Sequence, residues 1–96
     1  MTQALRQQRT AIDELDLELL HLINRRAQAV AAIAQLKREN SLPISDEARE
    51  AAVLNAIVER NSGPLNSASL RRIFGSILAE SRRLQYHLGA ESSCTK

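Results

Sequence analysis

A chain of 96 residues is long enough for one domain only, and its small size makes a closed pocket difficult to build without a second copy. Helix-forming residues are abundant and Phe74 and Tyr86 are the only aromatic residues, a composition that favours an all-α fold over a sheet. The net charge of +2 combines 13 basic with 11 acidic residues, and this balance, with so few aromatic residues, argues against nucleic-acid binding.

The sequence contains no targeting segment and no residues with the spacing of a metal-binding motif. No stretch has the pattern of a signal peptide or a membrane span, so we expect a cytoplasmic protein that does not bind membranes. Cys94 is the single cysteine and cannot form a disulfide within the chain. His21 and His87 lack the spacing of metal ligands, and there is no glycine-rich phosphate loop. We therefore expect neither a metal nor a cofactor.

The first predicted helix runs from about residue 5 to residue 39. Glycine and proline are absent before Pro43, and apolar residues recur in steps of three and four along this stretch. At about 1.5 Å per residue the helix would be roughly 50 Å long, which is more than two shorter helices can cover. We expect its uncovered half to pack against a second chain, which predicts an intertwined homodimer.

The second predicted helix covers residues 46–61 and follows a linker at residues 40–43. Ser45 or Asp46 is its expected N-cap, because a side-chain oxygen there can accept a hydrogen bond from a free backbone N–H of the first turn. The sequence Asn-Ser-Gly-Pro at residues 61–64 is expected to end this helix.

The third predicted helix covers residues 67–88, with Asn66 or Ser67 as its N-cap. Apolar residues recur along one side of it, and Gly89 is expected to stop it. Residues 90–96 are predicted to form a disordered tail.

Polar residues interrupt the apolar stripes of the first and third helices. In steps of three and four, the stripe of the first helix reads Arg9, Ile12, Leu15, Leu19, Leu22, Arg26, Val30, Ile33 and Lys37. Ser81 and Gln85 interrupt the third helix one turn apart. Any one cation could lie at the stripe's edge and reach water. Because no carboxylate on the stripe is spaced to neutralise all three, an anionic ligand is the expected partner.

Helix geometry separates these cations into two groups. Arg26 and Lys37 are eleven residues apart, close to three whole turns, so they face the same way and could close around a small molecule. Arg9 lies about 25 Å from Arg26 along the same helix. It can therefore join that pocket only from a second chain.

Near the start of the second helix lie Asp46, Arg49 and Glu50. Asp46 as a cap, with the other two in a solvated first turn, is one interpretation. Alternatively, a carboxylate beside the cationic pocket could accept a hydrogen bond from a substrate hydroxyl.

This set of polar residues resembles the active-site pattern of the AroQ-type all-helical chorismate mutases. The surrounding segments are also similar to that family: RTAIDELDLELLHLINRRAQAVAAIAQLK, PISDEARE and IFGSILAESRRLQ. The resemblance covers roughly residues 5 to 88. It implies a Claisen rearrangement of chorismate to prephenate, a step of aromatic amino-acid biosynthesis, in a domain-swapped dimer with two equivalent pockets.

The resemblance also implies roles for the cations and the amide. Arg26, with Arg9 from the second chain, would bind the two substrate carboxylates. Lys37 would bridge a carboxylate and the ether oxygen, and Gln85 would donate to the same oxygen.

For the remaining residues, the resemblance implies contacts around the ring hydroxyl. Glu50, helped by the backbone at Asp46, would hold this hydroxyl. Ser81 and Arg49 would support the carboxylate contacts and orient Glu50.

Two other functions are alternatives to a chorismate mutase. An isochorismate pyruvate lyase, which shares the fold but lacks the equivalents of Glu50 and Ser81, is one alternative. A non-catalytic helical dimerisation or regulatory module is the other.

Overall fold

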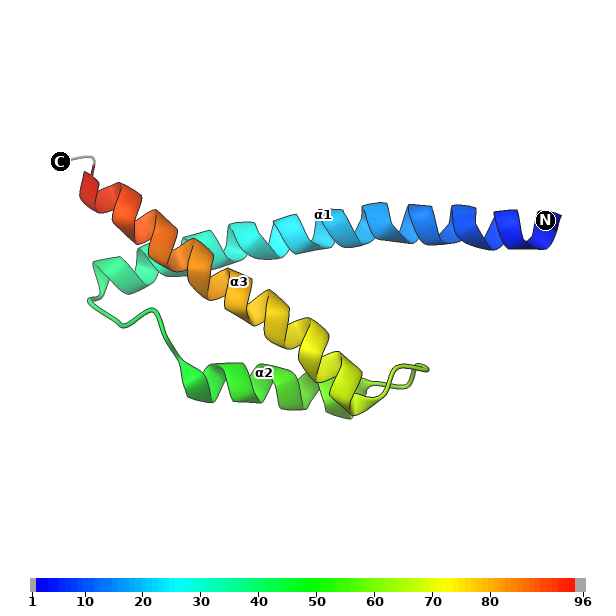
Figure 1. Ribbon diagram of the computed structural model, residues 1–96. Coiled ribbons are helices and arrows are strands. Elements are labelled where there is room, and N and C mark those ends of the chain that lie inside the picture. The colour runs from blue at the N-terminus through cyan, green and yellow to red at the C-terminus, as the bar shows by residue number, and fades with distance from the viewer. Residues whose placement is uncertain (1, 95–96) are drawn as a thin grey trace.

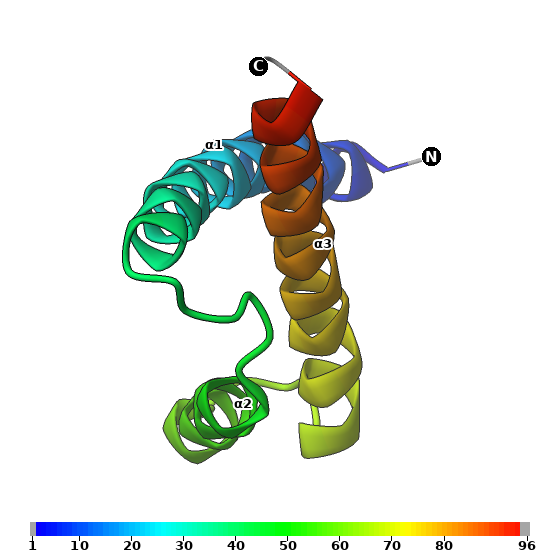
Figure 2. The same cartoon turned by 90° about the vertical axis from the view of Figure 1, so that its left-hand side faces the viewer.

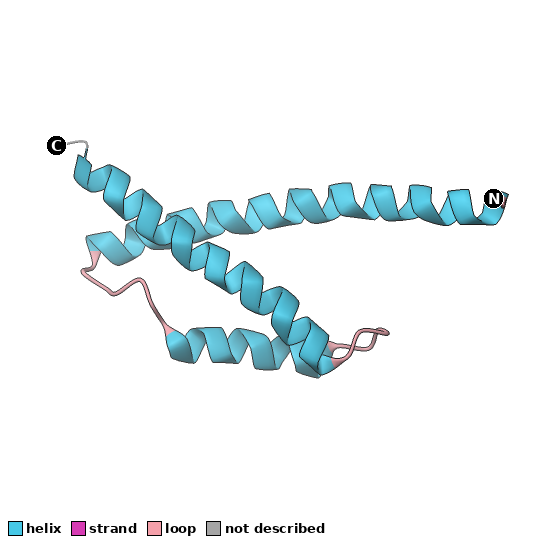
Figure 3. Ribbon diagram, viewed as in Figure 1, coloured by secondary structure: helices cyan, strands magenta, loops and turns pink. Residues whose placement is uncertain are grey.

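Three α-helices make up the protein. The computed structural model describes residues 2–94, with side chains for residues 2–89. The helices are α1 (Gln3–Glu39), α2 (Glu47–Arg60) and α3 (Ser67–Cys94), and residues 2–94 contain no strand (Figure 1, Figure 3). The all-α fold predicted from composition and periodicity is confirmed. None of these helices is long and apolar enough to cross a membrane.

A tight hydrogen-bonded turn ends α1 and redirects the chain. Backbone N–H groups of Ser41 and Leu42 donate to the carbonyls of Arg38 (3.2 Å) and Lys37 (2.8 Å), the pair of bonds that defines a Schellman motif. The motif requires a left-handed residue, and Ser41 supplies it with φ of 56°. The chain therefore leaves α1 sharply after Glu39, one half-turn beyond Lys37.

The two shorter helices begin at side-chain caps. Oδ1 of Asp46 accepts a hydrogen bond from the backbone N–H of Arg49 over 2.9 Å. Oδ1 of Asn66 does the same for Ser69 over 2.8 Å. Each carboxylate or amide oxygen satisfies a backbone donor that has no partner within its helix.

The predicted end of the third helix near Gly89 is wrong, because α3 continues to Cys94. Gly89 does not adopt the left-handed conformation of a helix-ending glycine, since no described glycine has a positive φ. The residues that follow include Ala90 and Glu91, which are good helix formers, and no proline interrupts them. The predicted disordered tail is thus helical through residue 94, and residues 95–96 lie outside the described part.

Helix α3 packs against both other helices, whereas α1 and α2 do not pack against each other (Figure 2). The buried apolar side chains include Val30 and Ala34 of α1 and Leu70 and Leu78 of α3. The radius of gyration is 17.4 Å, well above the about 13 Å of a compact domain of 100 residues. The packed core therefore follows α3, which packs against the C-terminal half of α1 and against α2.

The N-terminal half of α1 projects beyond the other helices (Figure 1). Its large apolar side chains are exposed, with Ile12, Leu15, Leu19 and Leu22 between 54% and 56% accessible. An apolar face of this extent is normally covered by another surface.

Candidate active site

A pocket of about 290 Å³ lies where α1 and α2 diverge and α3 bridges them. Its size is close to the lower end of small-molecule sites. The lining residues are Arg26, Val30, Ile33, Lys37, Ile44, Asp46, Arg49, Glu50, Val53, Leu78, Ser81, Arg82 and Gln85.

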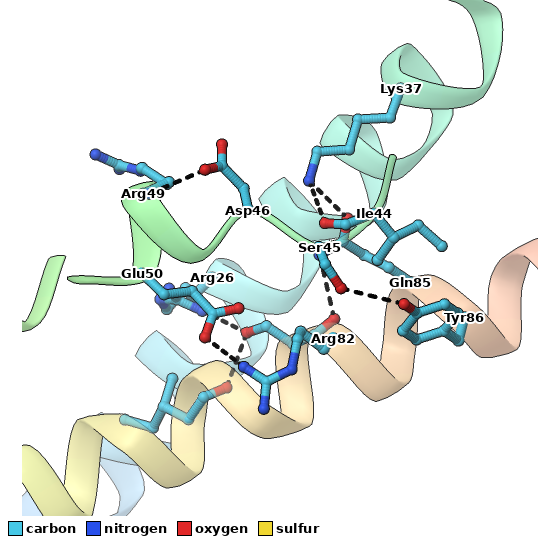
Figure 4. Close-up of polar contacts among 12 residues, drawn as sticks. Arg26, Lys37, Ile44, Ser45, Asp46, Arg49, Glu50, Arg82, Gln85 and Tyr86 are labelled. Atoms are coloured by element: carbon cyan, nitrogen blue, oxygen red, sulfur yellow. Dashed lines mark hydrogen bonds and ion pairs between the residues drawn. The ribbon is translucent and has the colours of Figure 1, made fainter. Parts of the chain in front are cut away.

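Every site residue predicted from the sequence lines this pocket except Arg9. The helices and the linker before α2 thus bring together side chains that are far apart in the sequence (Figure 4). Arg9 lies on the projecting half of α1, away from the pocket of its own chain.

Arg26 is held at the pocket by Ser81. Nη1 of Arg26 donates to Oγ of Ser81 over 2.6 Å, and that hydroxyl donates in turn to the carbonyl of Ile77 over 2.9 Å. The side chain of Ser81 is thereby fixed between α1 and the backbone of α3. A guanidinium has five N–H donors, so Arg26 keeps donors for an anion in the pocket.

Lys37 joins the linker to α3. Its Nζ donates to the carbonyl of Ile44 over 2.7 Å and to Oε1 of Gln85 over 3.3 Å. Gln85 is buried, with 7% of its surface accessible. Because an ammonium group can only donate, it fixes the amide with its oxygen towards Lys37. The other end of the amide, Nε2, has one long contact, 3.5 Å to the carbonyl of Ser81, and remains a donor for a ligand.

Arg82 is the charged pocket residue that the sequence analysis missed. Its Nη1 donates to Oε1 of Glu50 in an ion pair between α3 and α2 (Figure 4). The signal was present in the spacing, because Leu78, Arg82 and Gln85 follow one another in steps of four and three on one face of α3. Ser81 lies on the apolar stripe of the third helix, whereas Arg82 lies one position beside it, and for this reason Arg82 was not among the predicted site residues.

At the start of α2, Asp46 acts as the helix N-cap, which is one of the two interpretations that the sequence allowed. Its carboxylate caps the helix through the backbone N–H of Arg49, and it also borders the pocket. The guanidinium of Arg49 points away from Glu50 and Arg82 (Figure 4) and makes no hydrogen bond or ion pair to other described residues. Arg82, rather than Arg49, contacts Glu50.

The charge of the pocket suits an anionic ligand. Four cationic side chains and two anionic side chains line it, which is a net excess of two positive charges. Among the side chains of residues 2–89, no group of three or more His, Cys, Asp or Glu is arranged to hold a metal ion. The cationic and amide side chains that line the pocket can bind an anion by hydrogen bonds and stabilise negative charge by fixed donors.

The sequence profile of the chorismate mutase type II family matches residues 8–86. The chain belongs to this family. Among solved structures, it is similar to chorismate mutase from Thermus thermophilus (form II), with 28% identity, a TM-score of 0.86, and coverage of 88% of this chain and 96% of that one. It is also similar to chorismate mutase from Helicobacter pylori in complex with prephenate, with 30% identity, a TM-score of 0.82, and coverage of 90% and 93%.

Longer members of the chorismate mutase family align with this chain as well. The bifunctional chorismate mutase/prephenate dehydratase of Neisseria gonorrhoeae is 42% identical over 72 residues, or 75% of this chain. That of Stutzerimonas stutzeri is 37% identical over 86 residues. The chain spans only 19% and 23% of the lengths of these two relatives, so the match concerns one part of each.

Proposed function

We propose that this chain catalyses the Claisen rearrangement of chorismate to prephenate. The observation that carries the proposal is the convergence of Arg26, Lys37, Glu50 and Gln85 on one pocket in a chain of the chorismate mutase family. A relative of the same fold has been solved in complex with prephenate, the product of this reaction.

Substrate binding in this proposal relies on arginine. Arg26, held by Ser81, binds one carboxylate of chorismate, and Arg9 from a second chain binds the other. Planar guanidinium groups bind carboxylates with two parallel hydrogen bonds and so restrict their orientation. Arg49, at the border of the pocket, adds a third positive charge. Together they hold the flexible substrate in the compact conformation that the rearrangement requires.

Rate acceleration depends on the ether oxygen. In the rearrangement one carbon–oxygen bond breaks and one carbon–carbon bond forms within the substrate, so no nucleophile or proton transfer is needed. Negative charge develops on the ether oxygen as its bond breaks. Lys37 and Nε2 of Gln85 donate to that oxygen, and because both are already oriented, they stabilise the transition state more than the ground state.

The ring hydroxyl is recognised at the start of α2. Glu50 accepts its hydrogen bond, and the backbone at Asp46 contributes a second contact. Oε1 of Glu50 is engaged by Arg82, which leaves Oε2 as the acceptor.

The active assembly is a homodimer. The exposed apolar face of α1, the large radius of gyration and the position of Arg9 support this arrangement. Sedimentation should detect a dimer that loses helicity on dilution, and a stable, active monomer would contradict it. We expect no cofactor, nucleic acid or membrane to take part, and a cytoplasmic location stays a prediction.

A turnover assay tests the activity directly. The purified chain should convert chorismate to prephenate, and chromatography of the reaction mixture measures the prephenate formed. Lys37→Ala should lower kcat/KM by about a hundredfold or more, since an oriented donor to the developing charge is lost. Arg38→Ala, which removes the neighbouring exposed cation, is the matched control and should leave kcat/KM unchanged. Absence of prephenate, or release of pyruvate from isochorismate instead, would contradict the proposal.

A further inference from the structure

Arg82 occupies an unusual position among the charged residues of α3. It lies between Ser81 and Gln85 in the pocket wall, yet its guanidinium pairs with Glu50 on α2. The side chains of Arg82 and Glu50 are 37% and 26% accessible, so the pair is partly shielded from water.

The neighbouring ion pair of α3 provides a comparison. Arg83 pairs with Glu80 on the same helix, and their side chains are 76% and 61% accessible. Pairs this exposed are screened by water and contribute little. The Arg82–Glu50 pair differs because it joins two helices at the edge of a pocket and restricts a carboxylate there.

Arg49 is the other arginine close enough in sequence to orient Glu50. Successive residues of a helix point about 100° apart, so the two side chains leave α2 in different directions. Arg49 points away from Glu50 in Figure 4, and its backbone N–H is bonded to Asp46. Nothing on α2 itself therefore holds the Glu50 carboxylate.

We infer that Arg82 is the positioning residue for Glu50, and this inference rests on the proposed function. By binding Oε1, Arg82 restricts the rotation of the carboxylate and leaves Oε2 free to accept the ring hydroxyl of the substrate. Arg82 thus acts on the substrate through Glu50 and not by contact with a substrate carboxylate.

A double-mutant cycle distinguishes an Arg82 that positions Glu50 from an Arg82 that contacts the substrate directly. Arg82→Ala should lower kcat/KM roughly tenfold to a hundredfold, the scale of a misplaced binding group. In the Glu50→Gln background, the same change should have little further effect, because the group that Arg82 positions has lost its charge. Arg82→Lys should recover part of the loss. Arg83→Ala, the control with an equal change of charge on the same helix, should alter kcat/KM less than about twofold.

Two results would overturn the inference that Arg82 positions Glu50. If Arg82→Ala caused its full loss in the Glu50→Gln background, Arg82 would act independently of Glu50, and the inference would be wrong. Equal losses in Arg82→Ala and Arg83→Ala would also overturn it. Arg82→Gln keeps more of the side-chain length and provides the same cycle if Arg82→Ala does not fold, as judged by circular dichroism.

Failure of the proposed function would look different. A parent chain that does not convert chorismate would overturn the activity but would not touch the ion pair. In that case the urea midpoints of Arg82→Ala, Glu50→Gln and the double variant measure the pair itself. Non-additive midpoints would support positioning of Glu50 by Arg82, and additive midpoints would overturn it.

Discussion

Lys37 and Gln85 meet between α1 and α3, where Nζ of Lys37 donates to Oε1 of Gln85 over 3.3 Å. This contact turns the amide so that Nε2 is the group available to a ligand. In the proposed reaction Nε2 donates to the ether oxygen. A substitution that replaces this donor with a titratable group tests whether activity depends on it.

Replacement of Gln85 by glutamic acid should make activity depend on pH. A protonated carboxyl can donate to the ether oxygen, whereas an ionised one cannot and also repels the developing negative charge. Gln85→Glu should therefore keep useful activity in mild acid and lose about a hundredfold in kcat/KM as the introduced group ionises. The parent should show no comparable loss over the same pH range. A variant with the parent's pH profile and an intact fold would make Gln85 a packing residue.

Mixed dimers test whether one pocket uses two chains. Arg9→Ala and Arg26→Ala should each be inactive alone, but one of the two pockets of a heterodimer keeps both arginines. After co-refolding of equal amounts, half of the dimers are mixed, so about a quarter of the parent's activity should return. Heterodimers that are verified by mass spectrometry and remain inactive would indicate that Arg9 and Arg26 act within the same chain.

Removal of the Ser81 hydroxyl should weaken substrate binding through Arg26. Ser81→Ala deletes the acceptor of the 2.6 Å hydrogen bond, and such bonds to charged groups are worth about 1.5–3 kcal/mol. We expect kcat/KM to fall about tenfold or more, measured with chorismate. Ser76→Ala is the matched control, because Ser76 makes the same bond to the preceding turn, 3.0 Å to the carbonyl of Arg72, outside this pocket. Equal losses in both variants would argue against support of Arg26 by Ser81.

The turn after α1 offers a prediction about stability alone. Ser41 adopts φ of 56°, a conformation that costs a residue with a side chain about 1–2 kcal/mol and costs glycine almost nothing. Ser41→Gly also makes the unfolded chain more flexible, so the expected net gain is about 0.5 kcal/mol, measured by urea unfolding at fixed protein concentration. Ser62→Gly, at an exposed position where φ is not positive, should give no gain. A gain of the same size at both positions would refute the explanation.

Local features of the sequence were sufficient to predict the helices and most of the pocket. The absence of glycine and proline before Pro43 predicted a single long helix, and the structure has one in α1. Asp46 and Asn66 were among the predicted caps because a side-chain oxygen acts on its own first turn. Arg26 and Lys37 were found because polar residues on an apolar stripe need a partner. Each of these properties depends on residues within a few turns of one another.

Tertiary structure decided which distant side chains meet. Arg82 contacts Glu50 across 32 positions of sequence, and Arg49, the neighbour that resemblance suggested, points elsewhere. Gly89 shows the same limit at a helix end, since glycine permits a left-handed turn but does not compel one. Periodicity identifies the face of a helix on which a residue lies, whereas the partner it reaches depends on how α2 and α3 cross. That crossing is determined by the packing of whole helices, which the spacing within any one helix does not specify.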